Sequence, residues 1–397
     1  MDNCALKSPY APIRLRETTW WQGARSIAQR NGVLLDGRIR QGVPELIQNK
    51  FIKPNLENFE KNFRGHVHFV QMWLELLVSL SLLHQWIPLI AQYEVCGRQI
   101  FDLADAAVLA FTHTDVKDAT LEDLELPYEA FFIRIGPQLD ISGQVDVIED
   151  KSAGGGYHEQ HLYIDGVFVA RTASKDGAGR LTFGLTNVLD NGEDTYQPGL
   201  FLDLTAEEQK LPCLQAVEAS IARRAARLLE VSERKSVELE LNSDFATMIR
   251  TKHQIAIAET AEYFRKVLPL VLNCIMYVES VGRNQAVSPG RDVPPDRVVE
   301  WMHASPQRRQ KLRSALTRDG YTTVRLIGTE YEKLLSHGSG DMIAAHWRRG
   351  HVRMQPYGPG RTLKKRIRID PIFVNARGTS LDEPPGHRYV TTSNSKQ

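Results

Sequence analysis

Residues 161–172 read HLYIDGVFVART and residues 180–186 read RLTFGLT; these two stretches decide the class of fold. Both are rich in β-branched and aromatic residues and are bordered by turn residues, which is typical of β-strands. Asp165-Gly166 is a favoured two-residue hairpin turn, and a second Asp-Gly follows at Asp176-Gly177. We therefore predict an antiparallel meander of strands over 161–164, 167–172 and 180–186.

Apolar helices are expected around this meander. Residues 69–91 read FVQMWLELLVSLSLLHQWIPLIA. Polar residues at bilayer depth are costly, and this stretch contains Gln71, Glu75, His84 and Gln85. We therefore predict a buried core helix that ends near Pro88, and no membrane partner.

Further elements lie on both sides of the meander. Helices are predicted over 205–232, where Thr205 and Glu208 match a capping box, and over 256–278. A basic helix is predicted over 296–318. Strands are predicted over 128–135 and 322–327, because both are apolar and bounded by turn residues. The fold class is thus α+β, with an antiparallel meander in a mixed sheet packed against long apolar helices.

Changes in composition suggest how the chain is divided. Residues 284–295 are rich in Pro, Gly and Ser, which is typical of a linker. We predict a helical region over 1–98, an α+β core over 99–283, that linker, a basic C-terminal region over 296–377, and a disordered tail over 378–397. In the basic region we expect a loop and a strand that pack back on the body, with Phe373 and Val374 inward.

Bulk composition narrows the class of protein. The chain has 397 residues, of which 42% are hydrophobic, so it can bury at least one full core. The chain has four widely spaced cysteines, Cys4, Cys96, Cys213 and Cys274. They form no CxxC pair and do not have metal-ligand spacing. This usage is typical of a reducing cytoplasm, and we expect no cofactor and no metal. The first thirty residues hold no continuous apolar run, so no signal peptide is expected.

The charge is distributed unevenly along the chain. Residues 346–369 hold eight Lys or Arg, two His and no acid, although the whole chain carries a net charge of only +1. The remainder is therefore net acidic by seven charges (1 − 8 = −7). Such a cationic segment indicates an anionic partner.

Glycines and prolines within residues 346–361 predict that much of this basic segment is loop. Arg can bind phosphate in a bidentate manner, and Trp and Tyr can stack on bases. The candidate RNA-binding residues are Trp347, Arg348, Arg349, Arg353, Tyr357, Arg361, Lys364, Lys365, Arg366 and Arg368. The structural alternative is an edge strand over 365–369 guarded by positive charge.

The same segment contains residue types used in acid–base catalysis. His346, His351 and Tyr357, with neighbouring arginines, could cleave RNA without a metal. The spacing matches no specific catalytic requirement, and the alternative is that backbone carbonyls hold the histidines. Neither cysteine nor carboxylate lies near His346 and His351, which disfavours zinc. We favour binding over intrinsic catalysis.

The basic segment also carries a family resemblance. HWRRGHVRMQPYGPGR at 346–361, followed by PIFVN at 371–375, resembles the C-terminal signature of a phage- and plasmid-borne anti-CRISPR family. That family blocks biogenesis of the type V-A CRISPR effector nuclease. Weaker similarity occurs over 100–103, 126–141 and 267–279, whereas 1–95 and 190–255 show none that is convincing.

The resemblance implies a regulator that acts during translation in the cytoplasm of a bacterial host. Such a protein would recognise the nascent N-terminal peptide of a type V CRISPR nuclease and promote loss of its mRNA. Its partners would be that peptide and RNA or the ribosome. Two alternatives stay open: a metal-free ribonuclease, and a non-catalytic RNA-binding accessory protein of a mobile element.

Overall fold

The computed structural model describes most of the chain. The described residues are 10–35, 38–39, 46–64, 69–116, 119–122, 124–136, 145–149, 157–173, 179–189, 201–238, 243–281, 287–290, 292–329, 331, 346–348, 350–369 and 372–374. The predicted tail over 378–397 lies outside these residues.

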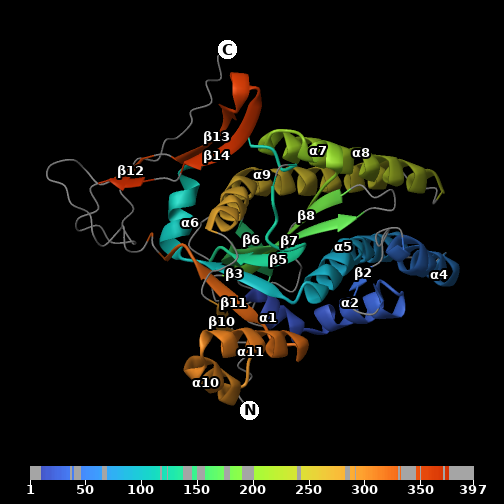
Figure 1. Cartoon of the computed structure of the whole chain (residues 1–397). Coiled ribbons are helices and arrows are strands. Elements are labelled where there is room, and N and C mark those ends of the chain that lie inside the picture. Colours follow the sequence, from blue (N-terminus) through green and yellow to red (C-terminus); the bar gives the residue numbers. More distant parts are fainter. Residues whose placement is uncertain are drawn as a thin grey trace.

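A mixed sheet forms the centre of the molecule (Figure 1). Its strand order is β10-β11-β3-β5-β7-β8-β9, and β6 also pairs with β7. β11, β3 and β5 are parallel, and the other neighbours are antiparallel. The predicted α+β class is confirmed. The strands are β3 (Gln99–Leu103), β5 (Ala130–Arg134), β6 (Val145–Glu149), β7 (Tyr157–Ala173), β8 (Gly179–Leu189), β9 (Phe201–Leu204), β10 (Val287–Pro289) and β11 (Thr323–Ile327).

Asp165-Gly166 is not a hairpin turn, which corrects the prediction. β7 runs through this dipeptide, with a bulge between Ile164 and Gly166 opposite β8. A Cβ on Gly166 would collide with the Phe132 ring and with the carbonyl oxygen of Ile133 on β5. The glycine therefore permits close strand packing, and pairing on both sides of β7 outweighs the local turn preference. The β7–β8 pair itself is confirmed.

Helices cover both faces of the sheet (Figure 1). Alternate residues of β5 enter different cores: Phe131 and Ile133 face one cluster, whereas Ala130 and Phe132 face the other. Burial on both faces explains why this strand is a continuous apolar run. The first cluster includes residues of α6 (Asp105–Thr112), α8 (Cys213–Glu238) and α9 (Ser243–Val281); the second includes residues of α1 (Ala11–Arg16), α2 (Thr19–Arg30) and α5 (Phe69–Val95).

The helix α5 continues past Pro88 to Val95, which corrects its predicted end. Trp86, Ile87, Leu89 and Tyr93 are almost fully buried, so tertiary packing holds the helix together across the proline. Its predicted role as a core helix is confirmed for this half. Among the described helices, none is long and apolar enough to cross a membrane.

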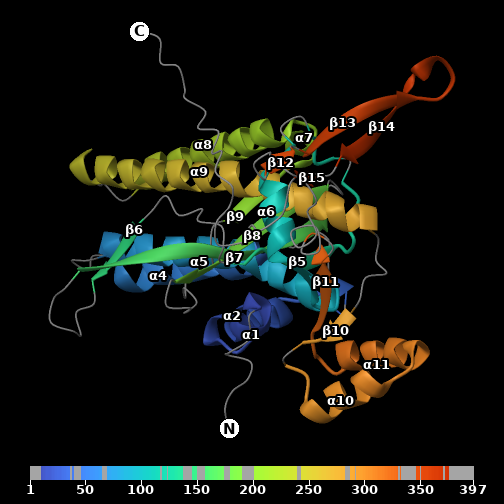
Figure 2. The ribbon, with the colours of Figure 1, turned by 90° about the vertical axis from the view of Figure 1, so that its left-hand side faces the viewer.

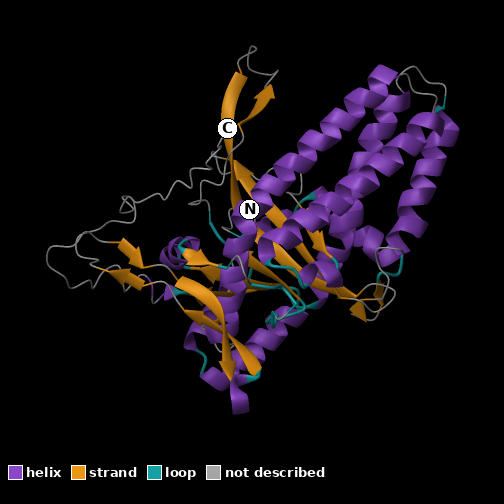
Figure 3. Cartoon of the chain, turned by 90° about the horizontal axis from the view of Figure 1, so that it is seen from above, coloured by secondary structure: helices purple, strands orange, loops and turns teal. Residues whose placement is uncertain are grey.

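Two further helical predictions are refined. The capping box is present: Thr205 and Glu208 exchange hydrogen bonds at the start of α7 (Ala206–Gln209), but the chain turns before α8 begins. α9 is longer than predicted and includes Pro269. Figures 1 and 2 show α8 and α9 side by side, and in Figure 3 long helices extend past the strands of the sheet. The remaining short elements are β1 (Leu34–Leu35), β2 (Arg38–Ile39), η1 (Gln48–Ile52) and α4 (Lys53–Phe63).

The region predicted as a linker and one basic helix is more structured. β10 lies inside 284–295 and pairs with β11. The basic helix is two helices, α10 (Pro295–His303) and α11 (Pro306–Arg318), because Ser305 caps a new helix and Pro306 occupies its first turn. The domain boundaries stay a prediction.

Candidate nucleic-acid interface

The basic segment forms mainly β-structure, which corrects the prediction of a loop. β13 (Gly350–Tyr357) and β14 (Leu363–Ile369) form an antiparallel hairpin, here called the basic ribbon. Its register runs from His351 opposite Ile369 to Tyr357 opposite Leu363. Only the tip is a loop, and it includes the 3₁₀ turn η2 (Pro359–Arg361). Regularly spaced apolar residues on both strands favour pairing, whereas Gly358 and Gly360 serve the turn alone.

The base of the basic ribbon is joined to the body, and its tip projects away (Figure 2). Gly350 and His351 pair in parallel with Thr114 and Asp115, which form β4 (Thr114–Asp115). The buried Asn273 side chain of α9 donates a 3.3 Å hydrogen bond to the Thr114 carbonyl oxygen. β4 therefore links the ribbon to the helical layer.

A second small sheet lies beside the ribbon. β12 (His346–Arg348) pairs with β15 (Ile372–Val374), so that His346 is opposite Val374 and Trp347 is opposite Phe373. The chain ends of the ribbon are thereby held together. Whether Phe373 and Val374 point inward stays a prediction. Arg349, between β12 and β13, lies outside the described residues.

The candidate catalytic residues occupy separate places. His346 lies in β12, His351 at the base of β13, and Tyr357 at the ribbon tip. Six residue steps along an extended strand separate His351 from Tyr357, or about 20 Å at the usual rise per residue. One phosphate cannot contact both side chains at that separation. The geometry therefore does not bring together the set that sequence reasoning considered for cleavage.

Basic positions occur on both faces of the ribbon. Lys364, Arg366 and Arg368 are alternate residues of β14 and so share one face, opposite Pro356, Met354 and Val352. Arg353 is opposite Ile367 and Lys365 is opposite Gln355, which places these two basic residues on the other face. The register thus distributes the basic positions over both faces of the ribbon.

The tip combines an aromatic ring, an aliphatic side chain and a guanidinium. Tyr357 and Leu363 are opposite in register and are 48% and 50% exposed. Gly358, Gly360 and Arg361 have φ values of 78°, 65° and 55°. Arg361 donates its backbone N–H to the Gly358 carbonyl oxygen at 3.0 Å, which closes the turn. A positive φ at a non-glycine residue is strained and is often found at functional sites.

Metal-ligand geometry is not found in the described part of the chain. No three His, Cys, Asp or Glu side chains gather there in an arrangement that could hold an ion.

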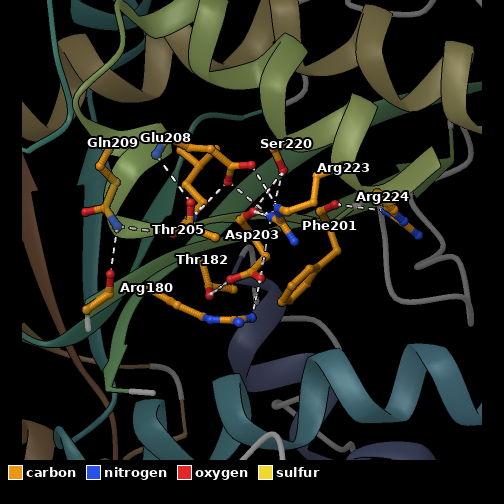
Figure 4. A network of polar contacts seen from close by, with 12 residues as sticks. Arg180, Thr182, Phe201, Asp203, Thr205, Glu208, Gln209, Ser220, Arg223 and Arg224 are labelled. Carbon is orange, nitrogen blue, oxygen red and sulfur yellow. Dashed lines mark hydrogen bonds and ion pairs between the residues drawn. The ribbon is translucent and has the colours of Figure 1, made fainter. Parts of the chain in front are cut away.

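A polar network that sequence reasoning missed joins β9, α7 and α8 (Figure 4). Arg223 donates from Nε to Glu208 Oε1 at 2.8 Å and from Nη2 to the Asp203 carbonyl oxygen at 2.6 Å. Ser220 donates to the same carbonyl at 2.8 Å. Burial raises the pKa of Glu208, but hydrogen bonds from Arg223 and from the Thr205 N–H outweigh it, and the pKa lies below its ordinary value. The network holds α8 onto the sheet edge; the capping box was its single signal in sequence.

Together these features define an α+β protein whose helix-covered mixed sheet presents a projecting cationic arm. A family model described as AcrVA2-like, the anti-CRISPR type V subtype A2 family, matches residues 101–376. The chain therefore belongs to this family of anti-CRISPR proteins. The matched range begins within β3, ends just after β15, and includes the whole ribbon.

Other comparisons add less. A crystal structure of AcrVA2 is similar to 89% of this chain and 95% of that chain, with 13% sequence identity and a TM-score of 0.38. A likeness of that size carries no argument about the site. No curated protein matches the chain.

Proposed function

We propose that this anti-CRISPR protein suppresses production of a type V CRISPR nuclease by recognising its nascent N-terminal peptide and promoting loss of its mRNA. Family membership supports the anti-CRISPR role. The observation that carries the RNA contact is the projecting basic ribbon, with basic positions on both faces and an exposed tip. The protein acts in the host cell, where the message is translated.

The ribbon suits RNA for three physical reasons. Residues 350–369, which form the ribbon, contain six Lys or Arg and no acid, so the ribbon attracts phosphates. Unpaired bases in RNA can stack on an exposed aromatic ring, and Tyr357 at the ribbon tip offers one. A projecting arm can also reach into a large ribonucleoprotein while the body remains outside.

A reporter pair in a bacterial host tests peptide recognition. One message encodes the N-terminal segment of a type V nuclease fused to a reporter. The other carries compensating frameshifts around that segment, so that its RNA is nearly identical but its peptide differs. We expect the protein to lower the amount of the first message only. Equal loss of both messages would show that RNA sequence is read, and loss of neither would overturn the proposal.

A matched pair of variants tests the ribbon. Replacing Arg353, Arg361, Lys364 and Arg366 by Ala should abolish message loss. Replacing four exposed basic residues of the body, Arg25, Lys50, Lys61 and Arg64, by Ala makes the same charge change. This control should retain activity, and if both variants lose it equally, overall charge and not the ribbon is responsible.

An assay with purified components separates this proposal from the two alternatives, a metal-free ribonuclease and an accessory RNA-binding protein. Incubation of purified protein with RNA in the absence of ribosomes should produce no cleavage, because His351 and Tyr357 are about 20 Å apart along β13. Cleavage under those conditions would instead support a metal-free ribonuclease. RNA retention without message loss in cells would support an accessory RNA-binding protein.

A further inference from the structure

The helices α10 and α11, here called the helix pair, form a small unit with its own core. Two residues, Ala304 and Ser305, separate the helices. Arg309 donates from Nε to the Trp301 carbonyl oxygen and from Nη2 to the Met302 carbonyl oxygen, both at 3.1 Å. These hydrogen bonds satisfy two backbone carbonyl groups at the C-terminal end of α10, which have no partner within the helix. The core consists of Val293, Trp301, Leu312 and Leu316.

α11 attaches the helix pair to the body, which leaves α10 outside. Arg98 donates to the Thr317 carbonyl oxygen at 2.9 Å, and Arg313 donates to the Tyr128 hydroxyl at 3.3 Å. Arg16 donates to the carbonyl oxygen of Gly320, just after α11, at 3.1 Å. α10 lies farther from the sheet than α11 in two perpendicular views (Figures 1 and 2).

Two apolar side chains are exposed on the outer face of α10. Val299 is 51% exposed and Met302 is 58% exposed, the two largest values among exposed large hydrophobic side chains in the described residues. They are three positions apart on one helix and therefore lie on the same face. Met adapts its shape to different partners, which is useful in a docking surface. Neither side chain contributes to the small core.

Positive charge lies next to this apolar face. Residues 295–319 hold six Lys or Arg and three acids, a net charge of +3 (6 − 3). Arg308 and Lys311 are exposed neighbours on α11, and Arg308 is bound to Glu300 of α10 at 2.6 Å. Lys311 makes no ion pair with a described residue. Its charge is thus available to an incoming acidic group.

We propose that the outer face of α10 and the adjoining basic start of α11 dock an acidic protein segment that presents apolar side chains. An apolar centre with a charged rim is the anatomy of a protein–protein interface. RNA fits less well, because the aliphatic Val299 and Met302 offer no aromatic surface for base stacking. The surface is separate from the basic ribbon, so this partner is additional to the one proposed there.

Selection from a displayed library of random 12-residue peptides tests this surface on the full-length protein. We expect enriched peptides to be acidic and to carry apolar residues three or four positions apart. Their affinity should fall at least tenfold for the Val299→Glu and Met302→Glu variants, and also for Lys311→Glu. Leu214→Glu, at an isolated exposed leucine on α8, is the matched control and should bind as the parent does.

Three outcomes would overturn the proposal: no acidic enrichment, equal binding to the Val299→Glu variant, or a 20-nucleotide poly(U) RNA that loses affinity in these variants. Thermal melts check that the exposed substitutions leave the fold intact, and Met302→Ser provides a milder change. Because the message-loss reporter depends on the ribbon, failure here leaves that proposal standing, and the reverse is also true.

Discussion

The central sheet and the basic ribbon are both β-structure, yet different forces specify them. The central strands are buried on both faces, so Phe131, Phe132 and Phe168 are in contact with protein on every side. The ribbon tip has half-exposed Tyr357 and Leu363. Burial therefore dominates the energy of the sheet, whereas the ribbon depends on register, a tight turn and its attachment to β4. We expect mutations in the sheet to affect stability, and mutations in the ribbon to affect binding.

Replacement of Phe168 by Ala should produce the largest loss of stability. The Phe168 ring contacts four others, those of Trp21, Trp86, Tyr93 and Phe132. Removing a buried aromatic side chain typically costs about 3–5 kcal/mol of unfolding free energy. Urea unfolding measures the loss. Leu363→Ala at the ribbon tip is the control and should cost at most about 0.5 kcal/mol. Similar losses for the two variants would contradict the comparison.

Replacement of Gly166 by Ala should come next. The added methyl group would meet the Phe132 ring and the Ile133 carbonyl oxygen, so β5 and β7 must separate. Overpacking of this kind costs about 1–3 kcal/mol. Gly179→Ala in β8 is a matched control, because the nearest atom to its added carbon is 4.0 Å away. If both substitutions were neutral, close strand contact at Gly166 would be excluded.

A smaller, pH-dependent effect is expected at Glu208. Its pKa lies below the ordinary value in the folded state, so the contact stabilises the fold above the ordinary carboxyl pKa. That stabilisation is lost as the pH falls through the lowered pKa. Since Arg223 is partly exposed, we expect a contribution of only about 1 kcal/mol. Unfolding titrations from pH 7 into acid should therefore show a shallower decline for Glu208→Gln than for the parent.

The Arg223→Ala variant separates this contact from general acid sensitivity. It removes both hydrogen bonds to Glu208. It should lower stability at pH 7 and flatten the same acid decline. An unchanged decline in both variants would assign the acid sensitivity to other carboxylates.

Sequence patterns correctly predicted those helices and strands that are specified by the residues within the element itself. The apolar run of β5, the alternating pattern of β8 and the capping box before α7 all indicate their structure without knowledge of neighbours. The predictions were wrong where contacts between residues far apart in the sequence determine the local structure. Gly166 is enclosed by β5 and β8, and α5 passes Pro88 because its buried face packs on the sheet.

The candidate site shows the same division. Its residue types were predictable from charge and aromatic content, but its form was not. Gly350, Gly358 and Gly360 suggested a loop, whereas pairing between β13 and β14 depends on a register that joins residues up to eighteen positions apart. Composition cannot specify that register. It also cannot indicate that His351 and Tyr357 lie at opposite ends of one strand.

Replacement of Tyr357 by Ala should have almost no effect on stability but a measurable effect on RNA binding. The side chain is 48% exposed, so its loss should change the unfolding free energy by no more than about 0.5 kcal/mol. Stacking on one base is worth about 1–3 kcal/mol, or roughly five- to 150-fold in affinity. Tyr357→Phe keeps the ring and should bind as the parent does, because stacking does not need the hydroxyl. Fluorescence anisotropy with a single-stranded RNA measures all three proteins. If the Tyr357→Phe variant binds RNA as weakly as the Tyr357→Ala variant, the Tyr357 hydroxyl makes the contact with RNA. If both bind as the parent does, the tip does not meet RNA, and the ribbon acts through its charged faces alone.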